Sequence, residues 1–255
     1  MKKPLAGLCI VAATSLAAPA FAADLPAREY SKAPVVAPVP LYDWSGFYIG
    51  ANVGGAWNNS TSTNTALDGT FVSSGKGHNS GVIGGGQIGY NYMLSPNFLL
   101  GVEADVQGTS LKGSDTSVDG SNVHNTKLDA FGTVRGRAGF TQNNWLFYGT
   151  GGFAWSDGSV TRTQLATVVS VPPIPAVAGT VETSSNTRTG WSAGAGVEWG
   201  ITQNWTARLE YLYLDLGTVT SVFPISNRQQ TSSLTMNVAR FGVNYKFGGP
   251  VVARY

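Results

Sequence analysis

The most regular feature of the chain is an alternation of apolar residues with small or polar residues, from Trp44 to Phe247. It is clearest in the run 189–201, where tryptophan, alanine, valine and isoleucine alternate with glycine, serine and glutamate. A period of two residues is typical of a β-strand with two different faces, and no helical period is sustained. Eight such runs can be counted, over roughly 45–58, 79–93, 98–110, 127–140, 145–156, 189–201, 205–216 and 234–247.

The connections between these runs alternate in length. The gaps at 94–97, 141–144 and 202–204 are short, whereas 59–78, 111–126, 157–188 and 217–233 are long and rich in Ser, Thr, Asn and Gly. Short turns at one end and long loops at the other are the pattern of outer-membrane β-barrels, with the short turns in the periplasm. An even number of strands then places both termini in the periplasm.

The two faces of the runs differ in charge. Large apolar residues occupy one face, as lipid contact requires, and charged residues share the other face, which we expect to line the lumen. Because an unpaired charge away from water costs several kcal/mol, acids and bases in the lumen are expected to pair. The network either fills the barrel as a salt-bridge plug or lines a narrow polar channel. The predicted lumen residues are Glu103, Asp105, Asp129, Arg135, Arg137, Glu198, Arg208, Glu210, Arg240 and Lys246.

Aromatic residues gather near the predicted strand ends. Transmembrane barrels carry aromatic girdles at both membrane interfaces, where rings with one polar edge are favoured. The candidates are Trp44, Phe47, Trp57, Phe98, Trp145, Trp199, Trp205, Tyr245 and Phe247.

The fold class predicted from these patterns is all-β, an eight-stranded antiparallel transmembrane up-and-down β-barrel with short periplasmic turns and long extracellular loops. A soluble barrel such as a lipocalin would show the same alternation in the opposite sense, with apolar residues inside. The sets of arginine and glutamate opposite outward Leu, Val and Trp argue against that alternative.

The segments outside the runs have their own signatures. Residues 1–22 read as a signal peptide, because two lysines precede an apolar stretch and Ala20-Phe21-Ala22 suits a signal peptidase. A proline-rich segment, 23–43, is predicted as a periplasmic linker, 44–247 as the barrel and 248–255 as a C-terminal tail. The sole cysteine, Cys9, lies in the segment to be removed, so the mature chain is expected to have no thiol.

Composition supports a wall with one face in lipid. Only 12% of the residues are charged and 33 are glycine, whereas soluble domains average roughly 25% charged residues and about 7% glycine. The formal net charge of +2 argues against nucleic acid as a partner.

Several segments together resemble the alphaproteobacterial outer-membrane immunogenic, porin-family proteins. They are WSGFYIGANVGGAW (44–57), GVIGGGQIGYNY (81–92), GVEAD (101–105), GTVRGRAG (132–139), YGTGGFAW (148–155), GWSAGAGVEW (190–199), RLEYLYLDLG (208–217) and RFGVNYKF (240–247). The resemblance implies an eight-stranded barrel of the OmpA type in the outer membrane of a Gram-negative bacterium, supporting envelope integrity. Pore or haem-binding activity, claimed for some relatives, is a further implication of the resemblance. No catalytic residues come with it.

Partners follow from the membrane. We expect outer-membrane lipids, lipopolysaccharide and the barrel-assembly machinery, which reads a C-terminal aromatic residue. Here either Phe247 or Tyr255 could serve, and alternate apolar residues lead back from Phe247, whereas Pro250 interrupts any strand ending at Tyr255.

Catalytic and cofactor chemistry has little support in the sequence. The two histidines, His78 and His124, lie in or beside predicted loops without metal-ligand spacing. The sequence therefore predicts a non-enzymatic barrel without cofactor, metal or catalytic site, contributing to envelope structure and surface exposure. A weak, low-selectivity porin for small solutes and a haem-binding surface protein are the alternatives.

Overall fold

The computed structural model describes residues 42–116, 122–165 and 178–248. The chain divides into two compact units, 1–39 and 40–255, and only the second contains described residues. Those residues form nine strands: β1 (Gly46–Ala66), β2 (Phe71–Ser95), β3 (Phe98–Thr109), β4 (Lys112–Thr116), β5 (Asn122–Gln142), β6 (Trp145–Gln164), β7 (Val181–Gly200), β8 (Trp205–Phe223) and β9 (Arg228–Lys246).

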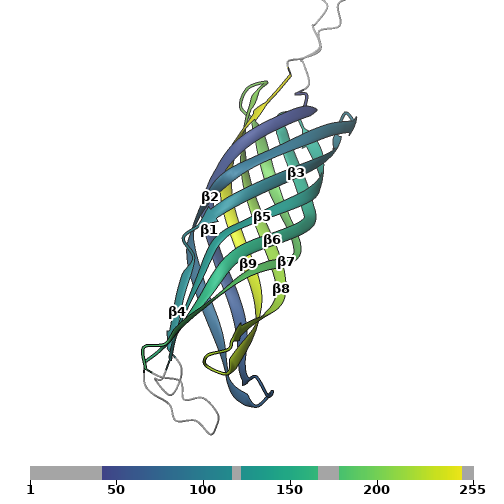
Figure 1. Cartoon of the computed structure of the whole chain (residues 1–255). Helices are drawn as coiled ribbons and strands as arrows, with labels where there is room; N and C mark the ends of the chain where they lie inside the picture. Colours follow the sequence, from purple (N-terminus) through teal and green to yellow (C-terminus); the bar gives the residue numbers. More distant parts are fainter. Residues whose placement is uncertain (1–41, 117–121, 166–177, 249–255) are drawn as a thin grey trace, which may run out of the picture. The chain divides into compact units, whose positions relative to one another are not determined.

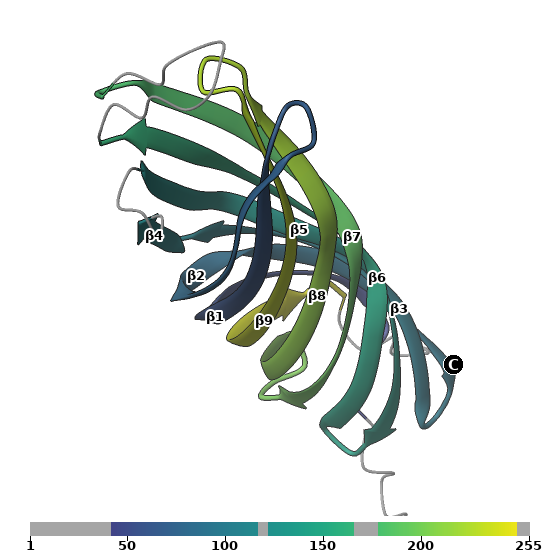
Figure 2. The same cartoon turned by 90° about the horizontal axis from the view of Figure 1, so that it is seen from below.

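The strands form one closed antiparallel ring, seen from two directions in Figures 1 and 2. Their order is β3-β2-β1-β9-β8-β7-β6-β5-β4, and the pairing of β3 with β5 closes the ring. β3 and β4 both pair with β5 and together occupy one position, so the ring has the eight positions that the sequence predicts. Closure leaves no free sheet edge within the wall, as a membrane-spanning sheet requires.

The short connections are tight turns at one end of the ring. β5 and β6 are joined by the two residues Asn143 and Asn144, and Asn143 has a φ of 57°. Asparagine tolerates this left-handed backbone conformation better than most residues, which suits it to a two-residue hairpin turn. We call this the short-turn end and the opposite end the long-hairpin end.

An apolar band surrounds the ring on its outer face. On β1 the outward positions are apolar or glycine from Phe47 to Trp57 and become polar at Asn59, and on β6 the band runs from Trp145 to Trp155 and ends before Asp157. Eleven residues from first to last match the roughly 9–11 that a tilted strand needs to cross a membrane. The strand positions nearest the short turns therefore form the membrane-crossing part of the wall.

The segments predicted as long loops are largely strands, which corrects the sequence prediction. β1 continues to Ala66 and β2 begins at Phe71, so most of 59–78 is a paired hairpin. The ladder of β1 and β9 likewise extends to Ala66 and Arg228. The sequence was misleading because beyond the apolar band both faces of a strand carry Asn, Ser and Thr, as in 58–65, and an antiparallel ladder satisfies its backbone without any apolar face.

Beyond the apolar band the ring separates into two sheets. The ladder between β7 and β8 reaches only Trp191 and Asp215, and the ladder between β2 and β3 reaches only Ile83 and Thr109. Among the described residues, the parts of β2, β1, β9 and β8 nearest the long hairpins form one four-stranded sheet. The corresponding parts of β4, β5, β6 and β7 form the other. At the long-hairpin end the two sheets are thus not joined by backbone pairing along these edges, but side chains connect them, as Asn186 does by donating to Ser221 at 2.7 Å.

Other expectations fall on residues outside the described ranges: the signal peptide 1–22, nearly all of the linker 23–43, and the tail beyond Gly248 including Tyr255. These stay predictions. The described residues contain no helix that is long and apolar enough to span a membrane.

Candidate functional site: the barrel lumen

An aromatic plug fills the lumen at the short-turn end. It consists of Trp44, Leu99, Leu146 and Tyr148, with Tyr42 packed against it. The Trp44 side chain is only 1% exposed, so the expectation that it belongs to an interfacial girdle is wrong. The reason is parity, because Trp44 stands an even number of residues before the inward residues Tyr48 and Asn52 of β1.

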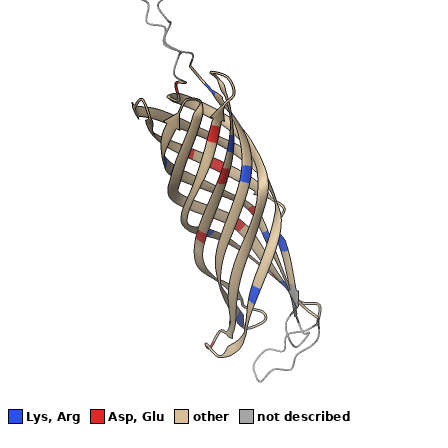
Figure 3. Ribbon diagram, turned by 180° about the vertical axis from the view of Figure 1, so that it is seen from behind, with Lys and Arg blue, Asp and Glu red and all other residues tan. Residues whose placement is uncertain are grey.

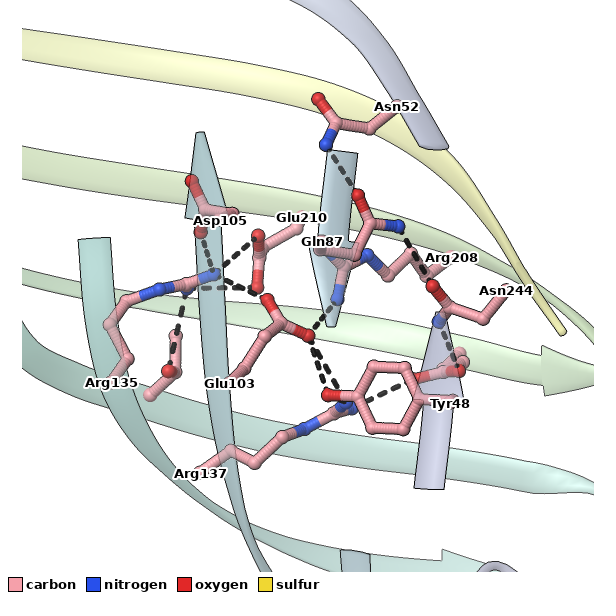
Figure 4. A network of polar contacts seen from close by, with 12 residues as sticks. Tyr48, Asn52, Gln87, Glu103, Asp105, Arg135, Arg137, Arg208, Glu210 and Asn244 are labelled. Carbon is pink, nitrogen blue, oxygen red and sulfur yellow. Dashed lines mark hydrogen bonds and ion pairs between the residues drawn. The ribbon is translucent and has the colours of Figure 1, made fainter. Parts of the chain in front are cut away.

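A charge network of four acids and four arginines occupies the next layer. Figure 4 shows its central side chains, and Figure 3 shows where charged residues lie along the strands. Its centre is Glu103, whose carboxylate lies within ion-pair distance of all four arginines: Arg135 at 2.6 Å, Arg137 and Arg240 at 3.6 Å, and Arg208 in a very short contact. Such convergence is what balances the desolvation of buried charges. The members are Glu103, Asp105, Arg135, Arg137, Glu198, Arg208, Glu210 and Arg240.

The other carboxylates of the network are also multiply bonded. Asp105 accepts hydrogen bonds from Thr133 at 2.6 Å, Arg135 at 3.0 Å and Arg240 at 3.1 Å. Glu210 accepts from Arg240 Nε at 2.7 Å and from the Arg135 guanidinium at 3.1 Å. Because every acid has a charged donor, no carboxylate of this layer is left unpaired.

Neutral side chains surround the charged groups and extend the network of contacts. Arg137 donates to Glu198 at 2.7 Å and lies 4.0 Å from the centre of the Tyr148 ring. Glu198 also accepts from Asn244 at 2.8 Å, and Asn244 in turn accepts from Gln87 at 2.8 Å. Figure 4 shows these side chains converging on one region from different strands.

An apolar cluster fills the lumen on the other side of the charge network, toward the long hairpins. Leu212, Leu214, Phe131, Met236 and Val238 are each 0% exposed. They come from three strands, β5, β8 and β9, and pack into one cluster with six further residues. The aromatic plug, the charge network and the apolar cluster therefore form three successive layers of buried side chains in the lumen.

The structure places nine of the ten predicted lumen residues in buried positions, at most 5% exposed. Asp129 is the exception: its side chain is 44% exposed and pairs with Lys127 at the surface. A β-bulge between Leu128 and Ala130 interrupts the alternation, so Leu128 enters the apolar cluster instead. Lys246 lies apart from the network and donates to the backbone carbonyl of Asp43 near the plug.

The remaining predicted girdle aromatics lie on the outer face. Neighbouring strands bring some of them into contact: the ring centres of Trp145 and Trp199 are 6.0 Å apart, and those of Trp205 and Tyr245 are 5.1 Å apart. The outward set, between 37% and 62% exposed, is Phe47, Trp57, Phe98, Trp145, Trp199, Trp205, Tyr245 and Phe247.

Sequence reasoning missed two lumen tyrosines. Tyr48 donates to Glu103 at 2.6 Å and Tyr148 donates to Glu210 at 3.1 Å. Both residues share the inward parity of their strands, but aromatic side chains were expected outside. The signal that could have found them is the glycine opposite each ring, Gly89 for Tyr48 and Gly196 for Tyr148.

The histidines lie outside the lumen layers. His78 of β2 has its Nδ1 2.7 Å from Asn59 Oδ1, and His124 of β5 is the register partner of Arg162. Over the described ranges, no group of three or more His, Cys, Asp and Glu side chains is placed to hold a metal ion.

Comparison with known proteins agrees with this architecture. Residues 8–247 match the family model described as "Outer membrane protein beta-barrel domain". The chain belongs to this family. A 31 kDa outer-membrane immunogenic protein of Brucella melitensis is 38% identical over 252 residues, covering 95% of this chain and 98% of the relative. A 22 kDa outer membrane protein of Rhizobium leguminosarum is 32% identical over 216 residues, covering 83% and 82% of the two chains.

Among solved structures, the outer membrane protein OprG of Pseudomonas aeruginosa is similar at 13% identity, with a TM-score of 0.48 and coverage of 80% of this chain and 97% of that one. The family match and the two curated relatives show that this chain is an outer-membrane protein of a Gram-negative bacterium. In such barrels the short turns face the periplasm and the long hairpins face outward.

Proposed function

We propose that this protein is a closed, non-enzymatic structural barrel that contributes to envelope integrity and presents polar hairpins at the cell surface. The observation that carries the proposal is the filled lumen. Three successive layers of side chains cross it, and in each layer at least one large side chain is no more than 1% exposed: Trp44 in the aromatic plug, Arg135 in the charge network and Leu214 in the apolar cluster.

The chemistry of the layers opposes ion flow in two ways. The apolar cluster offers no charged or hydrogen-bonding side chain to replace the hydration shell of an ion. In the charge network, each acid is held by arginine donors, so a passing ion would have to displace an existing pair. An eight-stranded barrel has an interior only just wide enough for side chains, and here that space is occupied.

Conductance separates the closed barrel from the alternative of a weak porin. Purified protein inserted in planar bilayers should give no reproducible single-channel steps, and the E103Q variant, which keeps the size of the side chain, should give none either, because the plug and the apolar cluster remain. A barrel from a general porin, reconstituted in parallel, verifies insertion and detection. Reproducible steps from the wild-type protein would overturn the closed-barrel proposal.

The envelope role is tested in cells that lack the gene. Their outer membrane should become more sensitive to detergent and more permeable to an apolar dye, and wild-type protein should restore both properties. Complementation by the E103Q variant, if it reaches the outer membrane, should also restore them, since the role requires a folded wall and no ion passage. A deletion strain indistinguishable from its parent in both assays would contradict the envelope role.

A further inference from the structure

A hollow lies on the outer, lipid-facing wall of the barrel, across β2, β3, β5 and β6, with a volume of about 640 Å³. Its sides are the bulky residues Tyr90, Leu100 and Val102, whereas its floor is made by residues with little or no side chain. The floor residues are Gly136, Ala138, Gly149 and Gly151.

Register explains why the small residues form a trough. Gly136 pairs with Gly151, and Ala138 pairs with Gly149, so β5 and β6 expose almost bare backbone side by side. The next strand continues the trough, because Ala195 of β7 is the partner of Gly149. Two outward rows of small residues thus run across neighbouring strands.

Bulky residues border the trough along its length. In the register of β5 and β6, Phe140 and Phe147 form the row nearer the short turns. Val134 and Phe153 form the row nearer the long hairpins, and Phe153 is 50% exposed. Neighbouring strands lie about 4.8 Å apart, so the trough of small residues from β5 to β7 is roughly 10 Å long. It ends at β3, where Leu100 and Val102 are the register partners of Ala138 and Gly136.

We propose that this trough binds one acyl chain of an outer-membrane lipid, lying across β5, β6 and β7 with one end against Leu100 and Val102 of β3. The trough lies within the apolar band, so it is continuous with the surface that the bilayer covers in a protein of this family. Its volume falls within the range of about 300–1,000 Å³ that is usual for small-molecule sites. Backbone and short side chains let a flexible chain approach closely, which gains dispersion contacts that a flat wall does not offer.

A second copy of the barrel fits this feature less well. A two-fold symmetric contact places the same patch of both copies face to face. Two hollows facing each other, each bordered by rings such as Phe147 and Phe153, would enclose an unfilled space, and close packing disfavours such voids. A narrow, flexible chain fills the trough without that cost.

The trough can be filled by substitution without disturbing the wall. A Cβ added to Gly149 would lie 4.0 Å from its nearest neighbour, and one added to Gly151 would lie 3.4 Å from Ser192 O. The double variant G149L/G151L therefore fills the floor from outside. A matched control is G84L/G86L on the outer face of β2, where added Cβ atoms would lie 3.7 Å and 3.6 Å from backbone oxygens.

The test uses photo-crosslinking in vesicles of phosphatidylethanolamine and phosphatidylglycerol that contain a phospholipid with a diazirine on its acyl chain. After irradiation, mass spectrometry of peptides should show adducts concentrated on 90–102 and 136–151, above the yield on β8 and β9. G149L/G151L should lose this excess, and G84L/G86L should keep it. Heat-modifiable migration verifies folding of each variant, and the single variant G151V takes the place of G149L/G151L if the double variant does not fold.

An even distribution of adducts around the barrel, or an unchanged excess in the filled variant, would overturn the proposal. Native mass spectrometry adds a second arm: a dimer of the wild-type protein that G149L/G151L abolishes would assign the trough to a second copy instead. The inference rests on the lipid-facing position of the wall alone, so it stands or falls independently of whether the lumen conducts.

Discussion

Tyr148 of β6 lies directly over Gly196, its register partner on β7. A Cβ on Gly196 would be 2.5 Å from the Tyr148 hydroxyl, so only glycine leaves room for the ring in this position. That position lets the hydroxyl donate to Glu210 at 3.1 Å. The relationship recurs across the barrel, where Tyr48 lies over its partner Gly89 and donates to Glu103.

The first prediction follows from this contact. G196A should displace the Tyr148 ring and destabilise the barrel by about 1–3 kcal/mol, the usual cost of overpacking a filled interior. Urea unfolding in lipid vesicles measures the effect. The control is G149A on the neighbouring strand, where the new methyl group faces outward and stability should hardly change. Equal effects of the two variants would contradict the packing argument.

A second prediction concerns the centre of the charge network. E103Q removes the carboxylate that faces four buried arginines, and leaving buried charges without their partner costs about 3–5 kcal/mol. The urea midpoint should fall accordingly. D129N is the control, because its exposed pair with Lys127 should contribute no more than about 1 kcal/mol. A large loss with D129N would mean that Asp129 reaches the lumen in the membrane.

The boundary of the apolar band gives a third prediction. On the outer face of β1, V53R places a charge in the band and should cost about 2–4 kcal/mol, whereas T61R lies beyond the band and should cost about 0–1 kcal/mol. Folding yield and urea stability in vesicles measure both. If the two variants were equally stable, the membrane would cover a different part of the strand.

The aromatic plug gives a fourth prediction. W44A should create a cavity at the short-turn end and destabilise the barrel by about 3–5 kcal/mol. W205A truncates a ring of similar size that is 48% exposed on the outer face, so its effect should be smaller. The temperature at which heat-modifiable migration changes reports the difference. A W44A protein as stable as the W205A protein would place Trp44 outside the lumen core.

A fifth prediction concerns the tip of the β8–β9 hairpin. The Glu182 carboxylate accepts backbone hydrogen bonds from Ile225 at 2.9 Å and Ser226 at 3.1 Å, linking this tip to β7 of the other sheet. Hydrogen bonds to a charged group contribute about 1.5–3 kcal/mol each. E182A should therefore increase cleavage by added protease between residues 223 and 228, while D157A should not. Unchanged cleavage in E182A would show that this contact does not hold the hairpin.

Much of the fold could be predicted because the period-two alternation and the alternating connection lengths are local properties. They gave eight strand positions, the short turns and the side on which nine of the ten predicted charges lie. Asp129 differed because a bulge resets the alternation beside it. Trp44 differed because it has the inward parity of Tyr48 and Asn52, whereas an aromatic residue at a strand end was expected outside. The bulge depends on how β5 pairs with β6, which residue order alone does not specify.

By itself, the sequence determined a two-faced wall: apolar positions alternate with polar positions because every strand has lipid on one side and the lumen on the other. Only the tertiary structure decided which charges meet. Glu103 and Arg135 are register partners, but Arg208, the register partner of Glu198, reaches across the lumen to Glu103 while Glu198 binds Arg137. Pairing across a closed ring depends on the shear and width of the barrel, and these arise only when all strands are in place.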